Sequence, residues 1–108
     1  ADKIYQIKKY IDKNFQKKIH LDMMAEVFYI SKYHMSREFK KVYGIPIANY
    51  VIAKRITRAK ELLRFTDMQI TEIGRICGIE DNSYFNKTFR KYEGMTASKY
   101  RKKWNGIG

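Results

Sequence analysis

The sequence predicts an all-α protein of seven helices, arranged as two similar halves joined by a long central helix. Three observations lead to this fold class. Apolar residues recur with helical spacing along nearly all of the 108 residues, whereas the strict alternation of a strand is hard to find. The chain repeats itself at a shift of about 50 residues, and each copy carries a glycine that can end a helix.

The first half of the chain contains the signals of three helices. An apolar stripe after Asp2, a residue suited to the N-cap, predicts a helix over about residues 3–15. Apolar residues between positions 24 and 28 mark a short second helix. A third begins after Ser31 and stops at Gly44, because glycine readily adopts the left-handed conformation found at helix ends.

A long central helix is expected after Pro46, and three shorter ones after that. The apolar pattern of the central helix continues to about residue 64, a length of about 28 Å at 1.5 Å per residue. The later helices cover about residues 70–77, 82–93 and 97–104. Asp81 and Thr96 are suitable caps for the last two. We therefore divide the chain into a first subdomain over residues 1–45, a linking helix over 46–64 and a second subdomain over 65–108.

Self-similarity is the most informative feature of the sequence. At a shift of 50, Arg37, Phe39, Lys40, Lys41, Gly44 and Tyr50 fall on Lys87, Phe89, Arg90, Lys91, Gly94 and Tyr100. Upstream the best shift is 49, so the second copy has one extra turn residue. Each copy contains a short helix, a tight turn and a longer helix. This is the helix-turn-helix arrangement, here in homeodomain-like three-helix units, whose second helix can lie in the major groove of DNA.

The longer helix of each copy has an apolar and a polar face. The residues expected to point inward are Met35, Phe39 and Val42 in the first copy and Phe85, Phe89 and Tyr92 in the second. The opposite faces have no Asp or Glu and consist of Tyr33, Ser36, Arg37 and Lys40, and of Ser83, Asn86, Lys87 and Arg90. Any solvated helix can show one such face. Its occurrence at the same place in two copies favours DNA binding.

Two pairs of equivalent residues bear on the packing and the turn of each copy. Ala25 and Gly74 lie where a bulky side chain would push the helices apart, so Gly74 is expected to permit a close contact. Gly78 suits a left-handed turn residue. Tyr29 takes that place in the first copy, where a bulky side chain predicts backbone strain or a different turn.

The composition limits the classes of function. The chain has 23 Lys and Arg against 11 Asp and Glu, and its net charge of +12 attracts polyanions such as nucleic acid or an anionic membrane. No apolar run approaches a membrane span, and the apolar stripes are used in packing short helices, so we expect no membrane partner. The single cysteine, Cys77, cannot form an internal disulfide and is expected in the core.

The sequence bears on three functions other than DNA binding. An enzyme or metal site needs a cluster of titratable groups, but His20 and His34 are neither paired nor spaced as ligands with Cys77, so we expect no enzyme activity, metal or cofactor. RNA binding stays an alternative, although Tyr33 is the only aromatic residue on the exposed faces that could stack a base. A helix-turn-helix adaptor that binds protein is the other alternative.

The residues resemble those of the AraC/XylS family of transcription regulators. In the first copy the resemblance rests on Ala25–Val27, on the run from Ser31 to Lys41, and on Tyr50, Arg55, Ala59, Leu62 and Leu63. In the second it rests on Ile73, Gly78, Ile79, Ser83–Phe85, Lys87–Tyr92, Gly94, Tyr100 and Arg101. The match covers about residues 4–104. One departure is His20, which stands where the family usually has a Ser or Thr cap.

The resemblance implies a bacterial regulator whose two recognition helices enter adjacent major grooves of double-stranded DNA. The residues implied as base readers are Tyr33, Ser36 and Arg37, with Asn82, Ser83, Asn86 and Lys87 in the second unit. Arg37 is suited to guanine and the asparagines to adenine. We assign the phosphate contacts to Lys32, Lys40, Lys41, Arg90 and Lys91.

The wider setting of the chain is also an expectation from the sequence. The chain begins Ala1-Asp2-Lys3, without an initiator Met, and we expect it to be a fragment of a longer cytoplasmic protein. Members of the family usually carry a separate effector-binding, dimerising or receiver domain. The resemblance thus implies a missing N-terminal domain, and RNA polymerase as a partner of the full-length protein.

Overall fold

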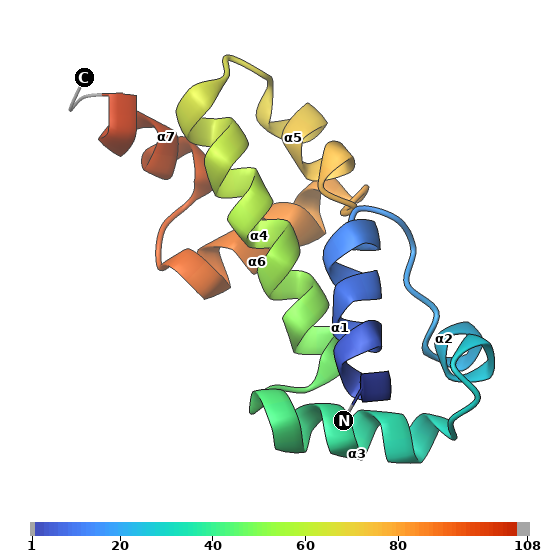
Figure 1. Ribbon diagram of the computed structural model, residues 1–108. Helices are drawn as coiled ribbons and strands as arrows, with labels where there is room; N and C mark the ends of the chain where they lie inside the picture. Colours follow the sequence, from blue (N-terminus) through green and yellow to red (C-terminus); the bar gives the residue numbers. More distant parts are fainter. Residues whose placement is uncertain (1, 106–108) are drawn as a thin grey trace. The chain divides into compact units, whose positions relative to one another are not determined.

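The computed structural model describes residues 2–105, and these residues form seven helices and no strand. The all-α prediction is therefore confirmed over this range (Figure 1). The helices are α1 (Asp2–Asn14), α2 (Leu21–Val27), α3 (Lys32–Tyr43), α4 (Ile47–Phe65), α5 (Ile70–Ile76), α6 (Asn82–Glu93) and α7 (Ala97–Asn105). Asp2 is itself the first helical residue of α1 rather than its N-cap, a difference of one position at a helix end.

The chain forms two compact units, Ala1–Ile52 and Ala53–Gly108, and the boundary lies within α4. The lengths of the helices confirm the internal repeat. Helices α2 and α5 have 7 residues each, and α3 and α6 have 12 residues each. Both of the longer helices end at a glycine with a φ of +76°, Gly44 and Gly94.

In the first unit, α1 and α2 pack on α3. Ser31 is the N-cap of α3, and its hydroxyl accepts a hydrogen bond from the backbone N–H of His34 at 3.0 Å. His20 makes no such side-chain bond at the start of α2, so that cap is weak, as expected. The buried core of the unit consists of Ile4, Ile7, Ile11, Met24, Ala25, Met35, Phe39, Ile47 and Val51.

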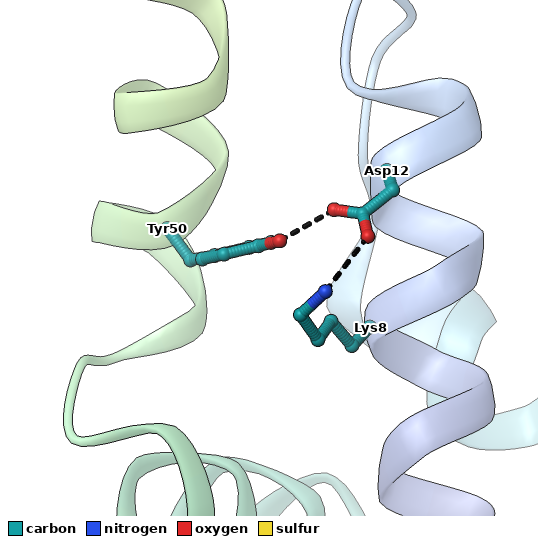
Figure 2. A network of polar contacts seen from close by, with 3 residues as sticks. All are labelled: Lys8, Asp12 and Tyr50. Atoms are coloured by element: carbon teal, nitrogen blue, oxygen red, sulfur yellow. Dashed lines mark hydrogen bonds and ion pairs between the residues drawn. The ribbon is translucent and has the colours of Figure 1, made fainter.

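A polar network joins α1 to the first part of α4 (Figure 2). The Tyr50 hydroxyl donates a short hydrogen bond to Asp12, and the Lys8 ammonium lies 3.0 Å from the other oxygen of the same carboxylate. Burial, together with the bond to Asp12, raises the pKa of the Tyr50 phenol. The bond to Asp12 raises the pKa of Lys8. Both side chains thus keep the protons that the network needs at neutral pH.

In the second unit, α5 and α7 pack on α6. Asp81 caps α6 by accepting a hydrogen bond from the Tyr84 backbone N–H at 2.8 Å. The buried residues of this unit are Ile56, Ala59, Leu62, Leu63, Ile73, Gly74, Cys77, Ile79, Phe85, Thr88, Phe89, Ala97 and Tyr100. Burial raises the pKa of the Cys77 thiol to about 11, which leaves it protonated and unreactive at neutral pH.

Arg101 of α7 closes the end of α4. Its guanidinium donates to the backbone carbonyls of Leu63 at 3.1 Å, Thr66 at 3.1 Å and Met68 at 2.7 Å. The last carbonyls of a helix have no partner inside the helix. One cation therefore satisfies one carbonyl in the last turn of α4 and two carbonyls of the segment that follows it.

Two of the predicted inward-facing residues are exposed. Val42 is 54% exposed and Tyr92 is 36% exposed, so the prediction that they point into the cores is wrong. Both lie in the last turn of their helices. In this last turn, the side of the helix that faces the rest of its unit carries the residue four positions after the buried phenylalanine. This residue is Tyr43 in α3 and Glu93 in α6. Tyr43 packs on Phe39, with ring centroids 4.9 Å apart, and Glu93 forms an ion pair with Lys60 at 3.2 Å.

Of the two expectations for Tyr29, backbone strain or a different turn, the structure shows the first, because both copies have the same left-handed turn. Gly78 has a φ of +100°, and Tyr29, at the equivalent place, has a φ of +54°. A side chain in this region strains the backbone. Tyr29 is 90% exposed, so packing of its ring does not offset the strain.

The fold is expected to be more stable with glycine than with alanine at position 74, although alanine favours helices. A Cβ added to Gly74 would lie 3.0 Å from Cγ of Phe85 and 3.3 Å from the Ile79 carbonyl oxygen. Phe85 is fully buried and has little room to move. Overpacking costs about 1–3 kcal/mol, more than the roughly 1 kcal/mol that alanine gains in helix propensity. We expect Gly74→Ala to lower the free energy of unfolding by about 1 kcal/mol, measured by urea denaturation.

The reverse exchange at the equivalent position of the first unit is the matched control. Ala25→Gly removes a buried methyl group and a helix-favouring residue, and is also expected to cost about 1 kcal/mol. Stabilisation by Gly74→Ala would show that Phe85 yields and that the close contact is not the reason for the glycine.

Candidate nucleic-acid interface

The polar face of α3 is open to solvent. Tyr33 is 79% exposed, Arg37 and Lys40 are exposed, and Ser36 is half-buried. These four side chains line one open hollow with Leu21 of α2 and Ala48 of α4. The structure therefore brings the expected base readers of the first unit together, with a predicted phosphate contact beside them.

Three contacts organise the side chains on this face. The Lys32 ammonium lies 3.2 Å from the Asp22 carboxylate and 5.8 Å from the centroid of the Tyr33 ring. Nη2 of Arg37 lies 3.3 Å from Nδ1 of His34. The sequence analysis did not include Asp22, because only the turn between α2 and α3 places it beside Lys32. Lys32 therefore has an anionic partner within the protein itself.

The polar face of α6 is also exposed. Asn82, Ser83, Asn86 and Lys87 are all open to solvent. Asn82 and Asn86 line a second open hollow, whose other polar residues are Thr71, Thr96 and Ser98. Sequence reasoning noted Thr96 only as a cap, and its hydroxyl does accept a hydrogen bond from the Lys99 backbone N–H at 3.1 Å. This hollow is lined by amides and hydroxyls, whereas that of the first unit includes Arg37 and Lys40.

The remaining predicted phosphate contacts lie near the ends of the two longer helices. Lys40 and Lys41 are in the last turn of α3, and Arg90 and Lys91 are in the last turn of α6. All four side chains are exposed. Cations at this end of a helix are favoured by the helix dipole, so their clustering has a structural as well as a functional explanation.

Among residues 2–105, no three His, Cys, Asp or Glu side chains gather in a way that could hold a metal ion. None of the helices described is both long and apolar enough to cross a membrane.

Known proteins resemble this chain in sequence and in structure. Residues 24–103 match the family described as helix-turn-helix domain. The bifunctional transcriptional activator/DNA repair enzyme AdaA of Bacillus subtilis is 39% identical over 95 residues, which cover 88% of this chain and 45% of AdaA. The matched residues span between 31% and 38% of the length of each of four further curated relatives.

Two solved structures share the fold over almost the whole chain. A transcriptional regulator of Chromobacterium violaceum, described as having an AraC-type DNA-binding domain, has a TM-score of 0.87 and 25% identity, and the alignment covers 99% of this chain and 96% of the other. The DNA-binding domain of AdpA, solved in complex with a target DNA, has a TM-score of 0.92 with the same coverages. At 20% identity, AdpA shows likeness of fold alone. The chain belongs to the AraC/XylS family of transcription regulators, as its helix-turn-helix DNA-binding domain.

Proposed function

We propose that this chain binds double-stranded DNA in a sequence-specific manner and belongs to a bacterial transcription regulator. The observation that carries the proposal is the pair of exposed, acid-free polar faces on the equivalent helices α3 and α6. A net charge of +12 supplies the attraction to phosphate. The AdpA domain, which shares the fold, was solved with its target DNA. We propose that α3 and α6 enter successive major grooves of one duplex.

The side chains divide into two roles in this proposal. Tyr33, Ser36 and Arg37 read base edges in the first unit, and Asn82, Ser83, Asn86 and Lys87 do so in the second. The phosphate contacts are Lys32, Lys40, Lys41, Arg90 and Lys91. Arg37 presents a planar fork that can pair bidentately with guanine, whereas Lys87 is a point charge and orients less. Phosphate contacts fix the register on the duplex but carry no sequence information.

Selection of bound sites from random duplex DNA tests the proposal. If both helix-turn-helix units bind one duplex, the selected DNA sequences are expected to share two preferred segments, about one helical turn apart. Recovery of a single segment would contradict joint reading by both units. Equal binding to all duplexes, or stronger binding to RNA or to a protein, would contradict the proposed function.

Replacement of one predicted base reader and one predicted phosphate contact is expected to have different effects. Arg37→Ala should weaken binding to the preferred duplex by about 1–3 kcal/mol and relax the preference at one base pair. Lys41→Ala should weaken binding to all sequences alike. Both residues are exposed, so the fold should be unaffected. The measurement is the dissociation constant on the selected duplex and on duplexes with single base-pair changes. The same uniform loss for both variants would contradict the division of roles.

The setting of the whole protein is proposed from the family. The chain spans less than half the length of AdaA, so the full-length protein is proposed to carry a further N-terminal effector, dimerisation or receiver domain. RNA polymerase is the proposed partner in regulation, and the bacterial cytoplasm is the proposed location. No catalytic role is proposed for this domain.

A further inference from the structure

One side chain outside the proposed base-reading set contacts a member of it. Nδ1 of His34 lies 3.3 Å from Nη2 of Arg37, one helical turn further along α3. Arginine is always protonated and can only donate, so Nδ1 of His34 must be the acceptor. The contact is a hydrogen bond in the ring tautomer that carries its proton on Nε2 and leaves Nδ1 to accept.

The backbone of His34 is itself fixed. Its N–H donates to the Ser31 hydroxyl at 3.0 Å, in the first turn of α3. The imidazole thus starts from a position set by the helix cap. An arginine that bonds to the ring of this residue has fewer orientations than one that is free in solvent. Only one of its five N–H groups goes to His34, and four stay available for a base.

The bond is exposed to water in the free protein, and its contribution to the stability of the fold is therefore small. In a DNA groove, water is displaced from the pair. A hydrogen bond is stronger in such a low-dielectric setting, and an arginine held in place loses less entropy when it pairs with a base. The effect of His34 is thus expected in DNA recognition rather than in folding.

The second unit has different residue types at the equivalent positions. Tyr84 replaces His34 and Lys87 replaces Arg37. Among residues 2–105, no hydrogen bond or ion pair joins Lys87 to Tyr84. The arrangement in the first unit is therefore not a general result of the repeated fold, but depends on this pair of side chains.

We propose that His34 is a positioning residue, which holds the Arg37 guanidinium for readout of its base pair. This inference rests on the proposed function, because it assumes that Arg37 reads a base.

The test compares His34→Ala with His34→Asn on the selected duplex and on duplexes changed at the Arg37 base pair. Alanine removes the acceptor. The ratio of the affinities of the His34→Ala variant for the selected duplex and for the changed duplexes should therefore fall about two- to tenfold, the effect of one hydrogen bond. The amide oxygen of asparagine can replace Nδ1, so His34→Asn should keep most of the discrimination. The melting temperature should not change for either variant, since the residue is exposed.

A double variant, His34→Ala together with Arg37→Ala, shows whether His34 positions Arg37 or contacts a phosphate directly. In the Arg37→Ala background His34→Ala should have no further effect on discrimination or affinity. If it instead weakens binding to every duplex by the same factor with and without Arg37, His34 contacts phosphate itself and the inference is wrong. Failure of His34→Asn to restore discrimination would also overturn it. If Arg37→Ala alone leaves the preference unchanged at every base pair, base reading by Arg37 fails, and the inference fails with it.

Discussion

Raising the salt concentration from about 50 to 200 mM is expected to weaken DNA binding by about 10³- to 10⁵-fold. This range applies to proteins that contact about 6–10 phosphates, because each contact releases a counterion from the duplex. Five side chains are proposed as phosphate contacts, and backbone N–H groups at helix N-termini, with other cations among the 23 Lys and Arg, can supply the remainder. Four of the predicted contacts are exposed near the ends of α3 and α6.

The dissociation constant of the selected duplex, measured over a series of salt concentrations, checks this prediction. Lys41→Ala should reduce the slope of log affinity against log salt by about 1, the value of one phosphate contact. A matched control is Lys13→Ala, which removes an exposed cation in the last turn of α1, a helix that supplies none of the proposed contacts. A flat salt response, or the same change in slope for both lysines, would contradict the proposed phosphate contacts.

Phe39→Ala and Phe89→Ala are expected to give the largest losses of stability, about 3–5 kcal/mol each. Both rings are fully buried, at equivalent places in the two units. Phe39 packs edge to face on Tyr50, with ring centroids 5.5 Å apart, and Phe89 packs in the same way on Tyr100, at 5.6 Å. Truncation would remove these contacts and leave a cavity. A loss of this size is enough to unfold the affected unit of a marginally stable domain.

Urea denaturation of the variants measures this loss. Val42→Ala is the control for α3, because Val42 is apolar and on the same helix but more than half exposed, and it should change stability by less than about 0.5 kcal/mol. An unfolding curve unchanged by Phe39→Ala or Phe89→Ala would contradict the assigned cores. Losses of equal size at Phe39 and Val42 would show that burial does not decide the effect.

The helices could be predicted because their ends depend on local chemistry. Ser31, Asp81, Gly44 and Gly94 act within a few residues of their own positions, and the sequence was enough to place them. The direction of Val42 could not be predicted in this way. Its spacing matches the buried face, but in the last turn of α3 Tyr43, rather than Val42, packs against the core.

The candidate site could be predicted less completely than the fold. The exposed faces of α3 and α6 follow from helical periodicity, which the sequence contains. The ion pair between Asp22 and Lys32 depends on the turn between two helices, and the contact between His34 and Arg37 depends on side-chain rotamers. Neither is set by spacing alone. The assignment of each side chain to a base or a phosphate stays a prediction.

The two units are closed by polar links between residues far apart in the chain. The Tyr50 hydroxyl reaches back 38 residues to Asp12, and Arg101 reaches back 38 residues to Leu63. During synthesis from the N-terminus, the first link has both partners once residue 50 has been added, whereas the second must wait for residue 101. The first unit can therefore form its long-range link before the second has both partners of its own, and folding of the two need not compete.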